Sequence, residues 1–128
     1  MTCVLFVSCS RKKGNKDSMP NFVIIMADDL GYGDISCYAN TYIRTPNIDK
    51  LASEGIRFTD FHSNGAVCSP TRAALLTGKY QQRTGVEGVV TAKSHRHVGL
   101  SLDEITIAEE LKKYNYNCGM YGYVWVIL

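Results

Sequence analysis

PNFVIIMADDLGYGD, residues 20–34, carries the clearest structural pattern in the chain. The run 21–27 is almost wholly apolar and includes the β-branched residues Val23, Ile24 and Ile25. Such a run is typical of a strand that is buried on both faces, as in a parallel sheet. It ends at a pair of aspartates, and the glycines that follow predict a loop. Residues 20–34 therefore predict a buried strand with polar side chains at its carboxyl end.

Strand and helix patterns alternate along the rest of the chain. Helices are predicted at 45–55, at 71–77 and at about 105–113, strands at 56–61 and from 117 to 123, and a long loop at 81–101. Thr45 suits the cap of the first helix, Pro46 its first position and Gly55 its end. Ser101 and Glu104 fit a capping box for the last helix. The alternation indicates an α/β layered fold.

Composition bounds the class of protein. The chain has 128 residues, of which 45% are hydrophobic and 20% charged, values typical of a globular domain. The net charge of +2 is too small to indicate nucleic-acid binding. Five cysteines occur, at positions 3, 9, 37, 68 and 118, and none forms a CxxC pair. A zinc ribbon or a thioredoxin motif is therefore unsupported.

The N-terminal segment, residues 1–19, predicts export. The apolar run MTCVLFVSC is too short to cross a bilayer, which takes about 20 residues, so no transmembrane span is expected. It resembles the end of a bacterial secretion signal, and the stretch from Phe6 to Cys9 loosely resembles a lipobox. We therefore expect an exported protein, periplasmic or lipid-anchored in the bacterial envelope.

The adjacent carboxylates Asp28 and Asp29 are candidate metal ligands. They repel each other at the end of an apolar strand, and burial makes this repulsion worse. Hard divalent cations take carboxylate oxygens, and ligands of open α/β sheets lie at the carboxyl ends of strands. The alternative is an exposed strand end in which one aspartate caps the next turn. Local sequence leaves both interpretations open.

A second cluster lies in residues 66–78, AVCSPTRAALLTG. Cys68 precedes a predicted helix, whose N-terminus favours an anionic group. Arg72 is four residues further on, and its planar fork of donors suits tetrahedral oxyanions. The C-x3-R spacing excludes the C-x5-R motif of tyrosine phosphatases. The alternative is a buried thiol beside a surface arginine.

These segments together resemble the sulfatase family. Residues 66–78 match its signature, including the central C-x-P-x-R, and residues 20–34 match its opening strand and metal loop. Residues 45–52 and 55–58 match the segment between them. The similarity covers about residues 20–122, and two specific motifs stand in the right order.

The resemblance implies an alkaline-phosphatase-like layered fold with a largely parallel sheet, of which this chain would be the truncated N-terminal part. It implies a sulfuric ester hydrolase in which a maturation enzyme, formylglycine-generating or anaerobic, converts Cys68 to formylglycine. Arg72 would steady this group, and Asp28 and Asp29 would bind Ca²⁺ with ligands from much later in the chain. The substrate would be a sulfated small molecule or glycan. Ser69, Pro70 and Thr71 would guide maturation or shape the turn. Tyr32 and Asp34 would hold the metal loop together.

The sequence departs from the family near its end. Gly119-Met120-Tyr121-Gly122 matches, but the Lys-Trp-His that the family places next is replaced by YVWVIL. Residues 123–128 are therefore expected to be a divergent tail from a frameshift or a truncated gene. Sheet faces should then be exposed, and the chain alone inactive. A phosphodiesterase or phosphonate monoester hydrolase of the same superfamily, and an inactive remnant, are the alternative functions.

Overall fold

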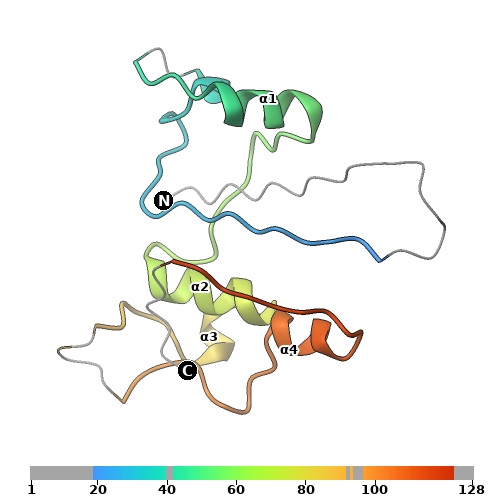
Figure 1. Ribbon diagram of the computed structural model, residues 1–128. Coiled ribbons are helices and arrows are strands. Elements are labelled where there is room, and N and C mark those ends of the chain that lie inside the picture. Colours follow the sequence, from blue (N-terminus) through green and yellow to red (C-terminus); the bar gives the residue numbers. More distant parts are fainter. Residues whose placement is uncertain (1–18, 40–41, 92, 94–96, 123–128) are drawn as a thin grey trace. The chain divides into compact units, whose positions relative to one another are not determined.

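The computed structural model describes residues 19–39, 42–91, 93 and 97–122. The chain divides into two compact units, Met1–His62 and Ser63–Leu128. The predicted export segment lies outside the described residues except for Met19, and the divergent tail 123–128 lies wholly outside them. Figure 1 shows the helices of each unit.

The first unit contains a short 3-10 helix, η1 (Ser36–Tyr38), in contact with α1 (Pro46–Glu54). The helix predicted at 45–55 is confirmed, with Pro46 in its first position and Gly55 directly after its end. The predicted role of the Thr45 hydroxyl is wrong, because the hydroxyl makes no capping bond to a backbone amide of α1. It donates instead to the carboxylate of Asp49, at 3.1 Å.

The apolar segment 21–27 runs as an extended stretch before η1 (Figure 1). Phe22, Val23 and Ile25 are exposed by 52%, 69% and 64%. No strand is assigned within 19–39, 42–91, 93 and 97–122, so the parallel sheet stays a prediction. An extended segment becomes a strand only when a neighbour pairs with its backbone.

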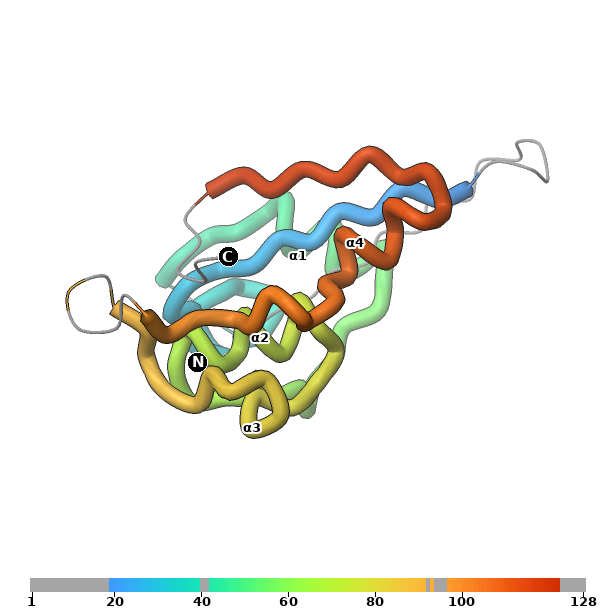
Figure 2. The backbone as a smooth tube through the Cα atoms, turned by 90° about the horizontal axis from the view of Figure 1, so that it is seen from below, coloured from blue at the N-terminus to red at the C-terminus, as the bar shows by residue number. Residues whose placement is uncertain are grey.

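The second unit contains α2 (Cys68–Thr77), α3 (Gln81–Thr84) and α4 (Ile107–Lys112). Both α3 and α4 contact α2, and Figure 2 follows the chain through all three. A buried hydrophobic cluster joins one residue of α2 to three from the connection that follows α3: Ala73, Val86, Val90 and Leu100. The helix that carries the cysteine signature is therefore also part of the core of this unit. No helix in the described part of the chain has the length and hydropathy to cross a bilayer.

The helix predicted at 71–77 is real but begins three residues earlier, at Cys68. Pro70 lies in the first turn, where a helix needs no amide donor, so proline does not delay the start. The predicted end is confirmed. Gly78 has a φ of 67°, and its N–H donates to the Ala74 carbonyl at 2.8 Å. A left-handed residue of this kind ends many helices and favours glycine.

Two predictions in the second unit are wrong. The loop predicted at 81–101 contains the one-turn helix α3. The last helix begins at Ile107 and is capped by Thr106 and Glu109, not by Ser101 and Glu104. Glu104 is engaged elsewhere, because its carboxylate binds Lys79 at 2.6 Å.

The stabilising contribution of the Thr106–Glu109 capping box should depend on pH. The Glu109 carboxylate accepts the Thr106 N–H at 2.7 Å and the Thr106 hydroxyl at 2.8 Å. These bonds, with the backbone one the stronger, hold the pKa of Glu109 below its usual value. A lowered folded pKa stabilises the fold above the ordinary pKa of glutamate, and this contribution is lost as the pH falls through the folded value.

Candidate active site

Cys68 is the first residue of α2 and is half-buried. The residue before it, Val67, has an extended backbone, so the chain turns into the helix at the cysteine itself. The thiol sulfur lies 4.0 Å from the hydroxyl oxygen of Ser69. The N-terminus of a ten-residue helix concentrates unpaired N–H groups, which favour negative charge at this point.

Arg72 lies four residues after Cys68 in the same helix. Because a helical turn takes 3.6 residues, the two side chains leave α2 on the same side, one turn apart. The Nε atom of Arg72 is buried in the second unit. The structure therefore groups the two predicted catalytic residues on one helix. Their catalytic roles stay predictions.

The residues between Cys68 and Arg72 are buried and hold the helix in place. The Ser69 hydroxyl, on a side chain with no exposure, accepts the Val90 N–H at 3.0 Å. The Thr71 hydroxyl contacts the carbonyls of Gly65 and Val67, at 3.1 and 3.0 Å. These bonds tie the first turn of α2 both to the core and to the loop that leads into it. The geometry supports the expected role of Ser69 and Thr71 in shaping the first turn of α2.

Replacing Ser69 by alanine should destabilise the second unit by about 1–3 kcal/mol, because the buried Val90 N–H loses its acceptor. Urea denaturation of both forms measures this difference. Ser101 is a matched control, because it is exposed and its hydroxyl accepts only a local N–H from Asp103. Ser101→Ala should change the free energy of unfolding by less than about 0.5 kcal/mol. Equal effects of the two substitutions would refute the structural role of Ser69.

Asp28 and Asp29 lie at a bend that follows the extended segment, and both are exposed. Asp29 has a φ of 54°, in the left-handed region, which aspartate tolerates better than most residues. The loop after them is closed from both ends. The Gly31 N–H donates to the Asp34 carboxylate at 2.6 Å, and the Asp34 N–H donates to the Gly31 carbonyl at 3.2 Å. The expectation that Asp34 helps to hold this loop is confirmed.

A side chain at Gly31 would displace the Asp34 carboxylate. A Cβ atom at this position would lie 2.8 Å from a carboxylate oxygen of Asp34. Gly31→Ala should therefore break the Gly31–Asp34 bond and loosen the loop. If Asp28 and Asp29 bind Ca²⁺, as proposed below, the affinity should fall about tenfold. A Ca²⁺ titration followed by amide chemical shifts measures the dissociation constant. Gly33→Ala is the control, because a Cβ atom there meets nothing within 4 Å. The same affinity in both variants would contradict this account.

The donor types at this loop fit a hard divalent cation. Asp28 and Asp29 offer carboxylate oxygens, the ligands that Ca²⁺ prefers. In the described part of the chain, no group of three or more His, Cys, Asp or Glu side chains is placed to hold a metal ion. Ca²⁺ takes six to eight oxygens, so two carboxylates by themselves would not complete a site.

The two predicted pairs belong to different units. Asp28 and Asp29 lie in Met1–His62, whereas Cys68 and Arg72 lie in Ser63–Leu128. Within each unit, the structure places the two members of a pair close together. The distance between the two pairs is not determined. Sequence reasoning missed the polar cluster formed by Ser36, Thr45 and Asp49, described below. The sequence signal for this cluster is Thr45 at the start of α1, which local sequence interprets only as a helix cap.

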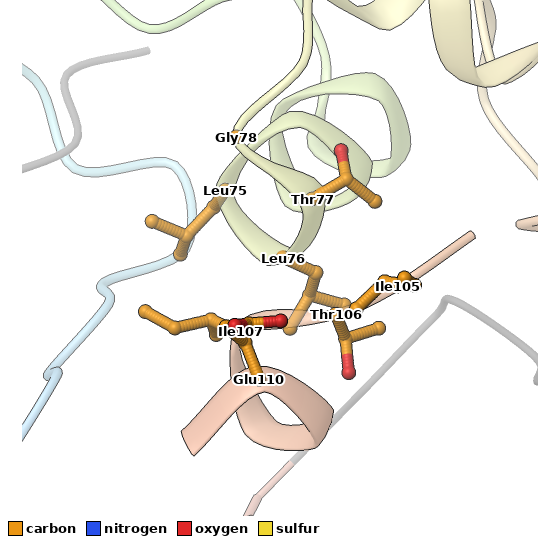
Figure 3. A pocket seen from close by; sticks show the side chains of 8 residues that line it. All are labelled: Leu75, Leu76, Thr77, Gly78, Ile105, Thr106, Ile107 and Glu110. Carbon is orange, nitrogen blue, oxygen red and sulfur yellow. The ribbon is translucent and has the colours of Figure 1, made fainter. Parts of the chain in front are cut away.

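A pocket of about 350 Å³ lies between α2 and α4, at the end of α2 far from Cys68 (Figure 3). Leu75, Leu76, Ile105 and Ile107 supply most of its apolar wall, with Glu110 on its rim. The helix rises about 1.5 Å per residue, so the pocket opens roughly two turns from the cysteine. It takes no part in the candidate site.

Comparisons with known proteins place these elements in a family. The model of the family described as Sulfatase matches residues 20–126. Arylsulfatase A of Homo sapiens is 50% identical over 103 residues, which cover 80% of this chain and 20% of that protein. Steryl-sulfatase of Homo sapiens is 45% identical over 112 residues, which cover 82% of this chain and 19% of that protein.

Solved structures agree. The crystal structure of the protein named Ps i-CgsB superposes with a TM-score of 0.65 at 38% identity, covering 70% of this chain and 20% of that one. A structure from work on the metabolism of multiple glycosaminoglycans by Bacteroides thetaiotaomicron gives 0.61 at 39% identity, covering 70% and 18%. The chain spans about a fifth of the length of the curated relatives it matches. By its matched family model and by the identity of these relatives, the chain belongs to the sulfatase family.

Proposed function

We propose that the chain supplies the nucleophile and two metal ligands of a sulfuric ester hydrolase. The observation that carries this proposal is the position of Cys68, half-buried at the first residue of α2, with Arg72 one turn away on the same helix. The parallel sheet of an alkaline-phosphatase-like fold is part of the proposal, with the extended segment 21–27 as one of its strands.

The proposed chemistry requires Cys68 as formylglycine. A maturation enzyme, with an external oxidant, replaces the sulfur and two hydrogens of the side chain by one oxygen, and water adds to the aldehyde. One hydroxyl of this gem-diol would lose its proton and attack the sulfur of the substrate. The sulfur–oxygen bond to the alcohol would break, and the leaving oxygen would keep the electron pair and take up a proton. The second hydroxyl would then lose its proton, the carbon–oxygen bond to the sulfate would break, and the aldehyde would return with release of sulfate. This is covalent catalysis with its own release step.

Each named residue has one task in this scheme. Arg72 orients the modified side chain and stabilises the negative charge that develops there. Asp28 and Asp29 would hold Ca²⁺, which when bound lowers the pKa of a coordinated hydroxyl and neutralises sulfate oxygens. The helix N-terminus at Cys68 favours the same negative charge.

The substrate and surroundings follow as further parts of the proposal. The substrate is a sulfated small molecule or glycan, and the partner that modifies Cys68 is a formylglycine-generating or anaerobic sulfatase-maturing enzyme. The N-terminal sequence supports export to the bacterial envelope, because residues 1–9 resemble the end of a secretion signal.

A chimera tests the proposal. Residues 20–122 replace the matching segment of human arylsulfatase A, to which the chain is 50% identical over 103 residues. The chimera is produced with a maturation enzyme and assayed against an aryl sulfate and the corresponding aryl phosphate. We expect sulfate hydrolysis well above phosphate hydrolysis. Preference for the phosphate would favour a phosphodiesterase-like enzyme, and a folded chimera without activity would contradict the proposal.

A second test concerns Cys68 alone. Mass spectrometry of the purified chain, produced with the maturation enzyme, should show conversion of the thiol to the aldehyde in the peptide that contains residues 66–78. The chain with Cys68→Ala should keep its unmodified mass. A free thiol in the native host would favour the inactive remnant.

A further inference from the structure

We propose that Asp49 is a positioning residue for the metal loop, acting through η1 on the segment that carries Asp28 and Asp29. The inference rests on the proposed function in one respect, that these two aspartates bind the cation. All residues involved lie in the first unit, Met1–His62.

The carboxylate of Asp49 joins two segments that are distant in sequence. Its two oxygens accept hydrogen bonds from the hydroxyls of Ser36, at 2.6 Å, and Thr45, at 3.1 Å. The two hydroxyl oxygens lie 2.7 Å apart. The N–H of Ser36 donates to the Thr45 hydroxyl oxygen and the N–H of Thr45 to the Ser36 hydroxyl oxygen, each at 3.0 Å. A single carboxylate therefore closes a cluster that binds the start of η1 to the start of α1.

The comparison with α4 shows that this arrangement exceeds a helix cap. In α4, the carboxylate of Glu109 accepts hydrogen bonds from the N–H and the hydroxyl of Thr106, three residues earlier. The carboxylate of Asp49 reaches Ser36, thirteen residues earlier and in another element. The hydrogen bond from Ser36 is the main reason that the pKa of Asp49 lies below its usual value, so the group is charged at neutral pH.

The far end of η1 contacts the metal loop. The ring of Tyr38 packs on the ring of Tyr32, with centroids 4.5 Å apart, and Tyr32 lies inside the loop that Gly31 and Asp34 close. The Tyr38 hydroxyl donates to the Phe58 carbonyl at 2.7 Å. A three-residue helix fixed at both ends is a short rigid connection, so displacement of Ser36 is passed to Tyr32.

Arg57 reinforces the same end of η1. Its guanidinium donates to the Cys37 carbonyl and lies 5.7 Å from the centre of the Tyr38 ring. A cation near an aromatic face adds a modest attraction. Asp49 and Arg57 thus hold η1 at different residues, Ser36 and Cys37. The Asp49 contact runs through hydroxyl groups, which conservative substitutions can remove one at a time.

The test is a Ca²⁺ titration of the full chain, followed by the amide chemical shifts of Gly31 and Gly33. Asp49→Asn and Thr45→Val should each raise the dissociation constant about tenfold, as loss of outer-shell partners does at metal sites. Thr45→Ser keeps the hydroxyl and should restore the original affinity. Glu109→Gln is the matched control, because it removes a capping carboxylate from the other unit. The cross-relaxation signal between the Tyr32 and Tyr38 rings should weaken in the first two variants alone.

Where Asp29→Asn weakens Ca²⁺ binding, unchanged affinity in Asp49→Asn would overturn the proposal. Loss of the α1 amide signals in both Asp49→Asn and Thr45→Val would also overturn it, because the carboxylate would then only build the helix. Asp29→Asn separates this inference from the proposed function. If Asp29→Asn leaves the affinity unchanged, the metal assignment fails, and the Tyr32–Tyr38 signal alone decides on Asp49: weakening in Asp49→Asn supports positioning, and no change refutes it.

Discussion

Replacing Cys68 by alanine in the arylsulfatase A chimera should reduce kcat/KM for aryl sulfate about ten-thousand-fold or more, because no group remains to accept the sulfuryl group. The thiol lies at the start of α2, and alanine suits a helix, so the fold should survive the substitution. Calorimetric unfolding of both forms checks this point. Cys118→Ser is the control. Cys118 is a free, exposed cysteine outside the candidate site, and its replacement should leave turnover unchanged.

Cys68→Ser gives the sharper result. Serine can accept a sulfuryl group once, but its sulfate ester has no second hydroxyl on the same carbon and cannot collapse to an aldehyde. We expect at most one turnover per molecule and a stable sulfated serine in the peptide of residues 66–78, visible by mass spectrometry. Sustained turnover by Cys68→Ser would show that no aldehyde is needed, and would refute the proposed chemistry.

The sequence predicted the helices where strong local signals stand at both ends. Pro46 and Gly55 bounded α1 correctly, and Gly78 ended α2. The predicted start at residue 71 is three residues late, because Pro70 lies inside the first turn of α2, where proline is tolerated. For a protein with Cys68 as its candidate nucleophile, this difference matters, since it places the thiol inside the helix and not before it.

Where two local signals compete, tertiary contacts decide between them. The residues Ser101 and Glu104 have the spacing of a capping box, and so do Thr106 and Glu109. Only the second pair caps α4, because Glu104 binds Lys79, twenty-five residues away in sequence. No pattern within a short window contains this information.

The candidate site shows the same division between local and distant information. Motifs identified Cys68 and Arg72, and a turn of helix accounts for their grouping. The strand predicted at 21–27 depends on a partner that the described residues do not supply, and its side chains are exposed. The Ser36 hydroxyl contacts the Thr45 hydroxyl, nine residues away, and donates to the Asp49 carboxylate, thirteen residues away. No local sequence pattern predicts contacts over these distances.

The 128-residue chain, purified by itself after maturation, should show no aryl sulfate hydrolysis above the rate without protein. Among the residues that the structure describes, the proposed metal site has two carboxylates, Asp28 and Asp29, against the six to eight oxygens that Ca²⁺ takes. Its apolar segment is also uncovered, with Val23 and Ile25 each more than half exposed, which favours association between copies.

A direct comparison makes this prediction decisive. The chain and the chimera are matured together, matched for aldehyde content by mass spectrometry, and assayed at equal concentration with Ca²⁺ in excess. Because both then carry the same aldehyde, a difference in rate reports what the remaining four-fifths of the relative contributes to catalysis. Hydrolysis by the isolated chain within about tenfold of the chimera would mean that Cys68 and its helix perform catalysis without a complete cation site. In that case the proposed role of Asp28 and Asp29 as metal ligands for catalysis would be wrong, even if the roles proposed for Cys68 and Arg72 were right.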